Sequence, residues 1–419
     1  MPYWINCRLV RMLLSALFLS ALPLLCRGQD VVCSAGFGSF DSNSTTGVAV
    51  SVGALKGTGL ARPACQAKLS WDNQELPLAP EAWQVDVDLM NVDLGFGPPV
   101  AALQIKEAEV DPLMTYEIYS LSKPPRKPRT ITGGDFFRAE DTNLDGQIEI
   151  WTRDAGAVNG FEGIGLSAFE FAPAIALRFE DQRLIDVSSE FPSHFDRQIA
   201  TLRTQLEAHE LNKFENSDGK LSSVSSLSVD ELTSLLNTKI RVLEIVWSYL
   251  YSGREQEAWH ALADMWPPRD FGRIRASILD ARARGIRKEV DGVPSLSAPA
   301  CRKKRAMIYD NVAKTTQKGV VNDQGGPDDK MKIFQLDTSP QPIFLRRPSP
   351  PPNVPAPSLN KAVVVDLVVD SAGKVWSIKT VGEPNKDIIA ASAEWKFVPG
   401  LRDGRPVAGR LRIEVAPFQ

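Results

Sequence analysis

The spacing of apolar residues changes twice along this chain of 419 residues, and these changes limit the folds that it can adopt. Residues 47–190 carry short runs of alternating apolar residues separated by Gly, Pro and Asp-Gly, which favour antiparallel strands. Apolar residues then recur at helical spacing from residue 192, and alternation returns in residues 359–419. We therefore predict a multidomain α+β protein: an N-terminal all-β domain, built as a sandwich or a partial propeller, then a helical middle and a C-terminal ββαβ domain.

The same changes in composition set the predicted domain boundaries. Residues 339–358 are rich in proline, which favours an extended polyproline II spacer between folded parts. The predicted order is a signal peptide at 1–28, a β-rich domain at 29–190, a helical domain at 191–290, a linker at 291–358 that is Pro-rich at its end, and a C-terminal domain at 359–419.

The N-terminal segment has the pattern of a secretory signal. Arg8 and Arg11 precede the apolar run of residues 12–26, and Gly28 offers a small residue for cleavage. The run is shorter than the ~20 residues of a membrane span, so a retained anchor is the less favoured alternative. We expect a periplasmic or secreted protein without a lasting membrane anchor. The net charge of −3 provides no positive field for nucleic acid, so no nucleic-acid partner is expected.

Three cysteines follow the predicted cleavage point. In an oxidising compartment, Cys33 and Cys65 are candidates for a disulfide. Cys301 would then be left over, and the alternative is that all three are buried thiols. The sequence contains no Cys-x-x-Cys motif, so it does not support a redox function.

Residues 359–419 predict a ββαβ unit. Alternating apolar residues at 363–369 lead into an Asp-Ser-Ala-Gly turn at 370–373, and a second strand follows. A short helix is predicted at 385–396 and a last strand at 407–415. Three apolar residues of the last strand share one face: Leu411, Ile413 and Val415.

Four motifs in this region resemble the C-terminal domain of the TonB family. They are the apolar strand ending in Asp370, the Asp-x-x-Gly-Lys-Val turn at 370–375, the Ala-rich helix running into Trp-Lys-Phe-Val-Pro at 395–399, and Asp-Gly-Arg-Pro-Val at 403–407. In that family the domain is a non-catalytic periplasmic module that pairs a strand edge with an extended segment of an outer-membrane partner. The resemblance implies an envelope-protein partner, such as an outer-membrane receptor, bound along the strand that carries Leu411, Ile413 and Val415.

Two features of energy-transducing TonB proteins are missing from the sequence. The apolar run at 12–26 contains no histidine, and no Tyr-Pro pair precedes the strand at 363–369. The resemblance therefore favours a protein-interaction module, and a TonB-type energy transducer for outer-membrane transport is an alternative. In a second alternative, the C-terminal domain only caps its own chain.

The loop at 141–149 carries oxygen-bearing side chains at alternate positions, and Gly146 is free to take a tight bend. This pattern resembles the Asp-x-Asn-x-Asp-Gly-x-x-Glu loops of integrin-type propeller blades. Because Ca²⁺ binds about six to eight oxygens, a calcium loop with a structural role in a ligand-binding β-domain is one interpretation. The other is an Asx-rich turn whose acidic side chains face water. The candidate metal ligands are Asp141, Asn143, Asp145, the carbonyl of Gln147, and Glu149.

The helical middle has one clear start signal. Residues 228–231, Ser-Val-Asp-Glu, form a capping box that predicts a helix running to residue 251. Residues 240–267 resemble one tetratricopeptide-like helical hairpin. A single hairpin cannot stack on copies of itself, so we expect it to pack on the β-domain or on the helix that follows.

No catalytic constellation is apparent in the sequence. The histidines at 194, 209 and 260 are scattered, and no zinc motif, phosphate-binding loop or nucleophile–base motif is present. We therefore predict that the protein is not an enzyme. A hydrolase whose active site is assembled from residues distant in sequence is the remaining alternative.

Overall fold

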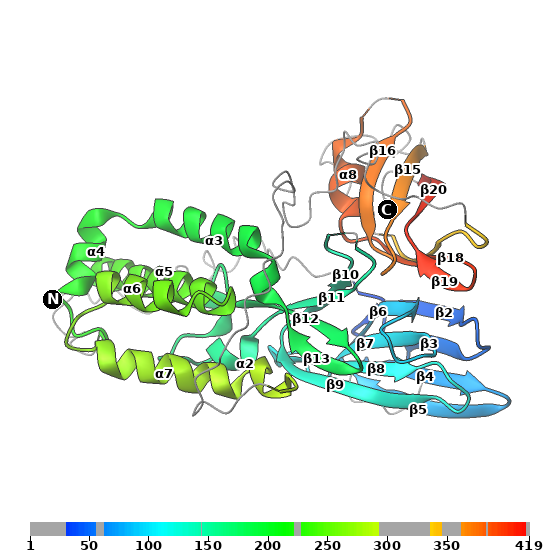
Figure 1. The fold of residues 1–419 in the computed structure, drawn as a ribbon, viewed down its shortest axis with the longest axis horizontal. Coiled ribbons are helices and arrows are strands. Elements are labelled where there is room, and N and C mark those ends of the chain that lie inside the picture. Colours follow the sequence, from blue (N-terminus) through cyan, green and yellow to red (C-terminus); the bar gives the residue numbers. More distant parts are fainter. Residues whose placement is uncertain are drawn as a thin grey trace, which may run out of the picture. The chain divides into compact units, whose positions relative to one another are not determined.

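The computed structural model describes residues 31–55, 63–143, 145–221, 228–292, 336–345, 362–382 and 384–415. The predicted signal segment, Cys301 and most of the predicted linker lie outside these residues. Within them the protein is mixed α/β, with several antiparallel sheets and a group of helices (Figure 1). No described helix combines the length and the apolar character needed to cross a membrane.

Two antiparallel sheets in the first part of the chain share one apolar core. Their strand orders are β2-β3-β4-β5 and β1-β6-β7-β8-β9. Val50 and Leu69 from the first sheet meet Val87 and Leu103 from the second in this core, as alternating apolar positions require. The strands are β1 (Cys33–Ser34), β2 (Ser39–Asn43), β3 (Ala49–Ala54), β4 (Cys65–Trp71), β5 (Gln74–Ala82), β6 (Gln84–Val92), β7 (Val100–Lys106), β8 (Met114–Ser120) and β9 (Arg126–Gly134).

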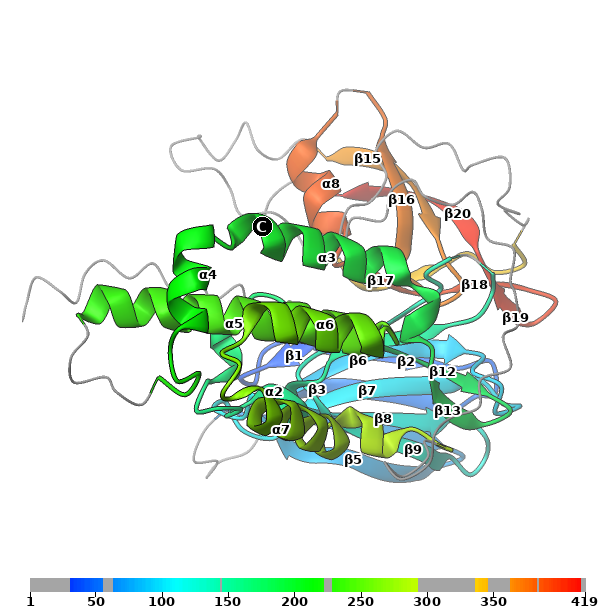
Figure 2. The same cartoon turned by 60° about the vertical axis from the view of Figure 1, so that its left-hand side comes forward.

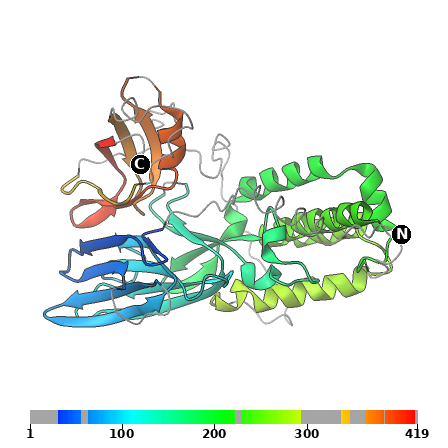
Figure 3. The ribbon, with the colours of Figure 1, turned by 180° about the vertical axis from the view of Figure 1, so that it is seen from behind.

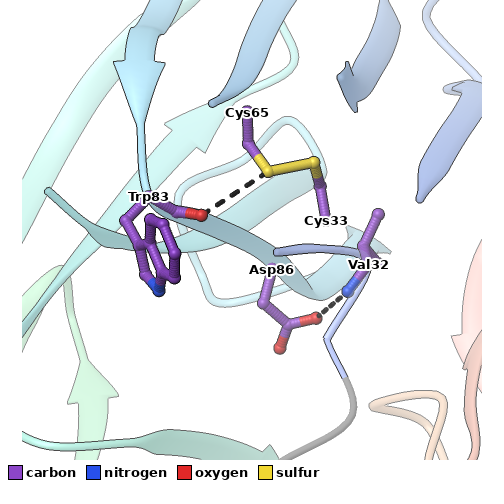
Figure 4. The surroundings of a disulfide bond; sticks show 5 residues. All are labelled: Val32, Cys33, Cys65, Trp83 and Asp86. Carbon is purple, nitrogen blue, oxygen red and sulfur yellow. Dashed lines mark hydrogen bonds between the residues drawn. A yellow bond between two sulfur atoms is a disulfide. The ribbon is translucent and has the colours of Figure 1, made fainter. Parts of the chain in front are cut away.

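A disulfide between Cys33 and Cys65 joins these two sheets (Figure 4). Cys33 lies on β1 and Cys65 begins β4, and both side chains are fully buried. Beside the disulfide, the amide of Val32 donates a hydrogen bond of 3.2 Å to Oδ1 of Asp86 on β6. The start of the described chain is therefore tied to β4 covalently and to β6 by a hydrogen bond.

A third antiparallel sheet and the helices form a second, larger core. Ile150 and Leu177 of the sheet and Trp247 of α5 are all fully buried in it. Helices α5 and α6 run side by side, and α3 and α4 also pack on α5 (Figure 2). The strands are β10 (Phe137–Glu140), β11 (Glu149–Arg153), β12 (Ala174–Glu180) and β13 (Arg183–Asp186), and the helices are α2 (Ala155–Val158), α3 (Pro192–Gln205), α4 (Ala208–Glu215), α5 (Val229–Tyr251), α6 (Glu255–Met265) and α7 (Phe271–Arg284).

The start of α5 shows why the sequence pattern located it well. The hydroxyl of Ser228 accepts a hydrogen bond from the amide of Glu231, and the Glu231 carboxylate accepts one from the amide of Ser228. This reciprocal pair satisfies two amide groups that a helix start would otherwise leave without partners. The predicted capping box is thus confirmed.

The described residues 336–345 and 362–415, which we call the C-terminal unit, form a third core (Figure 3). Its main sheet has the strand order β16-β15-β20, and helix α8 packs on β16. Trp395 and Phe397 fill the space between sheet and helix. The elements are β14 (Gln341–Phe344), β15 (Val363–Val369), β16 (Val375–Thr380), α8 (Lys386–Ser392), β17 (Lys396–Val398), β18 (Gly400–Arg402), β19 (Arg405–Val407) and β20 (Gly409–Val415).

The helix predicted at 385–396 is too long at its C-terminal end. Helix α8 ends at Ser392, and β17 begins at Lys396 and pairs with β14. Residues 390–395 have good helix formers, but Trp395 and Phe397 are both buried in the core of the C-terminal unit. Long-range packing of these two aromatic side chains outweighs the local helix propensity.

Candidate functional site

Strand β20 is an edge of the main sheet in the C-terminal unit. It pairs with β15 along its whole length, and no other described strand pairs with it. The predicted contact residues Leu411, Ile413 and Val415 pack into the core of the unit, and Val415 is almost fully buried. These three side chains hold β20 against the core, and its outer edge pairs with no other described strand.

The opposite face of β20 is charged and exposed. It carries Arg410, Arg412 and Glu414, and Arg412 donates a 2.8 Å hydrogen bond to Oδ2 of Asp366 on the neighbouring strand β15. Charged residues on an edge strand discourage indiscriminate pairing with other chains.

The loop at 141–149 is shaped by its own amides. Gly146 N–H donates to Oδ2 of Asp141 at 3.1 Å, Asp145 N–H donates to Oδ1 of Asn143 at 3.2 Å, and Gln147 N–H donates to Oδ1 of Asp145 at 2.8 Å. Gly146 has a φ of +85°, which suits the tight bend expected of it. Three of the predicted ligand side chains are thus oriented by the loop backbone itself.

Two of the predicted ligands are buried, and they differ in how well their oxygens are satisfied. Both oxygens of Glu149 are bonded, Oε2 by the amide of Thr142 at 3.1 Å and Oε1 by Nη1 of Arg178 at 3.3 Å. Asp141 is only 4 % exposed, and its Oδ1 has no hydrogen-bond partner in the described part of the chain. An unsatisfied buried carboxylate oxygen is costly, and a cation is one group that would satisfy it.

Burial makes these carboxyl groups hold their protons more tightly than usual. It raises the pKa of Glu149 to about 7 and that of Asp141 to about 6, and the Asp145 carboxylate adds to both effects. Among the described residues, no group of three or more His, Cys, Asp or Glu side chains is gathered tightly enough to hold a metal ion. Oδ1 of Asp141 is the one oxygen of these two buried carboxyl groups that lacks a hydrogen-bond partner among the described residues.

The C-terminal unit meets this loop through the turn between β15 and β16. The amide of Asp141 donates a 3.1 Å hydrogen bond to Oδ2 of Asp370, and the hydroxyl of Ser371 donates one of 3.0 Å to Oδ2 of Asp141. Both carboxylates are buried, and burial together with the charge of Asp141 raises the pKa of Asp370 to about 7. Sequence patterns did not indicate this contact, because it joins residues 229 and 230 positions apart.

Two buried lysines of the C-terminal unit pair with aspartates of strand β6. Lys374 Nζ donates to Oδ1 of Asp88 at 2.7 Å and to its carbonyl oxygen at 2.6 Å, and Lys396 Nζ donates to Oδ2 of Asp86. Burial opposes the ionisation of Asp88, but the two ammonium groups hold its pKa below the usual value. The signal for these pairs was present in the sequence, since two aspartates interrupt the apolar strand at 84–92.

A groove of about 290 Å³ lies where the loop and the C-terminal unit meet. Its lining includes Gly146 and Ile148 of the loop, Arg178 of β12, and Ser371 and Arg405 of the C-terminal unit. The Arg178 guanidinium is engaged by Glu149, Glu180 and Glu190.

The predicted calcium ligands are all contributed by one loop, while the predicted strand edge lies on a different element. The structure brings the loop next to Asp370 and Ser371, which belong to one of the motifs that resemble the TonB family. In comparisons with known proteins, no family model, no curated protein and no solved structure matches this chain.

Proposed function

We propose that this is a non-catalytic protein of the cell envelope, periplasmic or secreted, whose TonB-like C-terminal domain binds an envelope protein by strand addition. The observation that carries the proposal is the edge strand β20, which pairs with β15 on one side and with no described strand on the other. An unpaired strand edge has a row of N–H and C=O groups that an extended segment can satisfy.

The contacts of the C-terminal unit support this choice of edge. The turn between β15 and β16 and the strand β17 make the buried contacts with β6 and with the loop at 141–149. Strand β20 makes none of these contacts, and its outer edge pairs with no other described strand. The partner should therefore supply an extended segment that is compatible with alternating Arg410, Arg412 and Glu414.

Site-specific photo-crosslinking in envelope preparations tests the proposal. A photoreactive residue at Arg410 or Glu414 of the full chain should crosslink to one extended segment of an envelope protein. The matched control is the same group at Lys379, which is exposed on the opposite edge strand β16. Crosslinks of equal yield from Lys379, or none from β20, would contradict strand addition along this edge.

A second function is supported by the vacant Oδ1 of Asp141. We propose that the loop at 141–149 binds Ca²⁺, with Asp141, Asn143, Asp145, the Gln147 carbonyl and Glu149 as ligands, and that the ion stabilises a ligand-binding β-domain. Glu149 would exchange its hydrogen bonds with Arg178 and Thr142 for the ion. Calorimetry with Ca²⁺ should give a saturable isotherm for the wild type and a much weaker one for Asp145→Ala. Equal heats of Ca²⁺ binding for the wild type and Asp145→Ala would contradict calcium binding by this loop.

A further inference from the structure

The contact between Ser371 and Asp141 links the C-terminal unit to the loop at 141–149 through a single carboxylate. Oδ2 of Asp141 accepts hydrogen bonds from the Ser371 hydroxyl at 3.0 Å and from the Gly146 amide at 3.1 Å. These two donors, one from each side of the contact, both bond to Oδ2. They leave Oδ1 buried and without a partner among the described residues.

The charges around this carboxylate are only partly balanced by the nearest basic side chains. Asp370 places a second buried carboxylate beside Asp141, since its Oδ2 accepts the Asp141 amide. Lys374 is bonded to Asp88, and Arg178 is bonded to Glu149 and to two other glutamates. A divalent cation on Oδ1 would offset the negative charge at the point where the C-terminal unit and the loop meet.

We propose that a hard divalent cation, with Ca²⁺ as the best fit, binds the loop through Oδ1 of Asp141 and that its binding is coupled to the contact made by the C-terminal unit. The inference rests on the second function proposed above. It adds that Ser371 is a positioning residue for the ion, and that the ion in turn strengthens the attachment of the strand-bearing unit. Because coupling between two binding events is reciprocal, each should strengthen the other by the same factor.

Calcium is preferred to magnesium because of the geometry of the ligands. Asn143 and Asp145 are exposed and lie in a short loop, so they can adjust to an irregular coordination shell. Ca²⁺ accepts such shells, whereas Mg²⁺ requires a nearly regular octahedron and keeps most of its water.

Terbium titration of the full chain measures the affinity directly. Tb³⁺ replaces Ca²⁺ at oxygen sites, and its luminescence is excited by a nearby tryptophan. Trp151 is suitable because its Nε1 donates a 2.8 Å hydrogen bond to Thr142 of the loop. We expect saturable luminescence that excess Ca²⁺ displaces, and an apparent affinity about fivefold or more weaker in Ser371→Ala, as for a modest coupling between sites.

Two further variants separate coupling from loss of fold. Ser392→Ala is the matched control, because it removes a buried serine hydroxyl of the same unit that bonds only within α8. Lys396→Met weakens the attachment of the C-terminal unit at Asp86, on strand β6, and should also weaken Tb³⁺ binding. Hydrogen exchange of β17 should slow on addition of Ca²⁺ in the wild type and change less in Ser371→Ala.

The results that would overturn the inference are specific. An absence of saturable Tb³⁺ luminescence would contradict cation binding by the loop. Tb³⁺ binding of equal affinity in the wild type, Ser371→Ala and Ser392→Ala would contradict the coupling between cation binding and the contact made by the C-terminal unit. Neither result bears on crosslinking from β20, so failure of this inference is distinguishable from failure of strand addition.

Discussion

The buried pair of Lys374 and Asp88 allows a sharp test of how the C-terminal unit is attached. The perturbation is Lys374→Met, which keeps most of the side-chain volume and removes the charge. In the wild type, the Lys374 and Asp88 side chains are 4 % and 1 % exposed and their charged atoms are 2.7 Å apart. The variant leaves a buried carboxylate that has lost its direct cationic partner.

The expected loss of stability depends on the hydrogen bonds that Asp88 retains in the variant. Breaking a buried ion pair by removing one partner costs about 3–5 kcal/mol. Oδ2 of Asp88 still accepts hydrogen bonds from the Tyr116 hydroxyl at 2.7 Å and from the Ala139 amide at 2.9 Å. The remaining bonds place the cost at the lower end, about 3 kcal/mol. Adding Asp88→Asn should recover at least half of this loss, because the amide oxygen can keep both hydrogen bonds and no unpaired charge is left.

Equilibrium urea unfolding of the full chain provides the measurement, with hydrogen exchange of β17 to locate the effect. The control is Lys68→Met, which breaks an exposed pair with Glu75 and should cost less than about 1 kcal/mol. The reasoning is wrong if Lys374→Met costs no more than this control. It is also wrong if the losses in the double variant simply add.

Three other predictions concern single features of the fold. Burial raises the pKa of Glu244 on α5 to about 7 from 4.5, so the folded protein keeps a proton that the unfolded chain loses. The contribution of Glu244 to stability should therefore fall by up to about 3 kcal/mol as the pH rises from about 4.5 to about 7, and Glu244→Gln should reduce the pH slope in urea titrations by that amount while the slope from Asp141, Glu149 and Asp370 remains. Replacing Cys33 and Cys65 by alanine opens a loop with a sequence separation of 32 and should cost about 3–4 kcal/mol in the same assay, unless the pair is reduced in the native protein. Gly373→Ala places a side chain at a φ of +82° and against the Phe397 carbonyl, so thermal unfolding should show a loss of at least about 2 kcal/mol, and an unchanged midpoint would contradict the turn geometry.

Strands were predictable from the sequence where both alternation and burial were strong. The strand at 363–369 was predicted with the bounds it has in the structure, because one face of β15 is continuously apolar. Strands β5 and β9 have weak alternation, and both contain proline. Each strand lies at the edge of its sheet, where the missing amide donor of proline is tolerated. Proline therefore weakens the strand pattern in the sequence and at the same time indicates an edge strand.

The candidate site was predictable only in its local part. The loop at 141–149 is defined by hydrogen bonds between residues two to five positions apart, which a motif can specify. The contacts of Lys374 and Ser371 join residues more than 200 positions apart, and no local pattern determines such a pairing. Asp86 and Asp88 are charged residues within an apolar strand, but the sequence does not select their partners from among the 48 Lys and Arg residues of the chain.

The buried pairs also bear on how the C-terminal unit could be used. Lys374 and Lys396 lie in motifs that resemble the TonB family, and here both are directed at the chain's own strand β6. Buried ion pairs add little net stability compared with apolar packing, but they strongly penalise misplaced contacts. The two buried ion pairs therefore contribute more to the specific orientation of the C-terminal unit on β6 than to the strength of its attachment. Such an attachment leaves the outer edge of β20 without a paired strand among the described residues, which is the edge that the proposed strand addition requires.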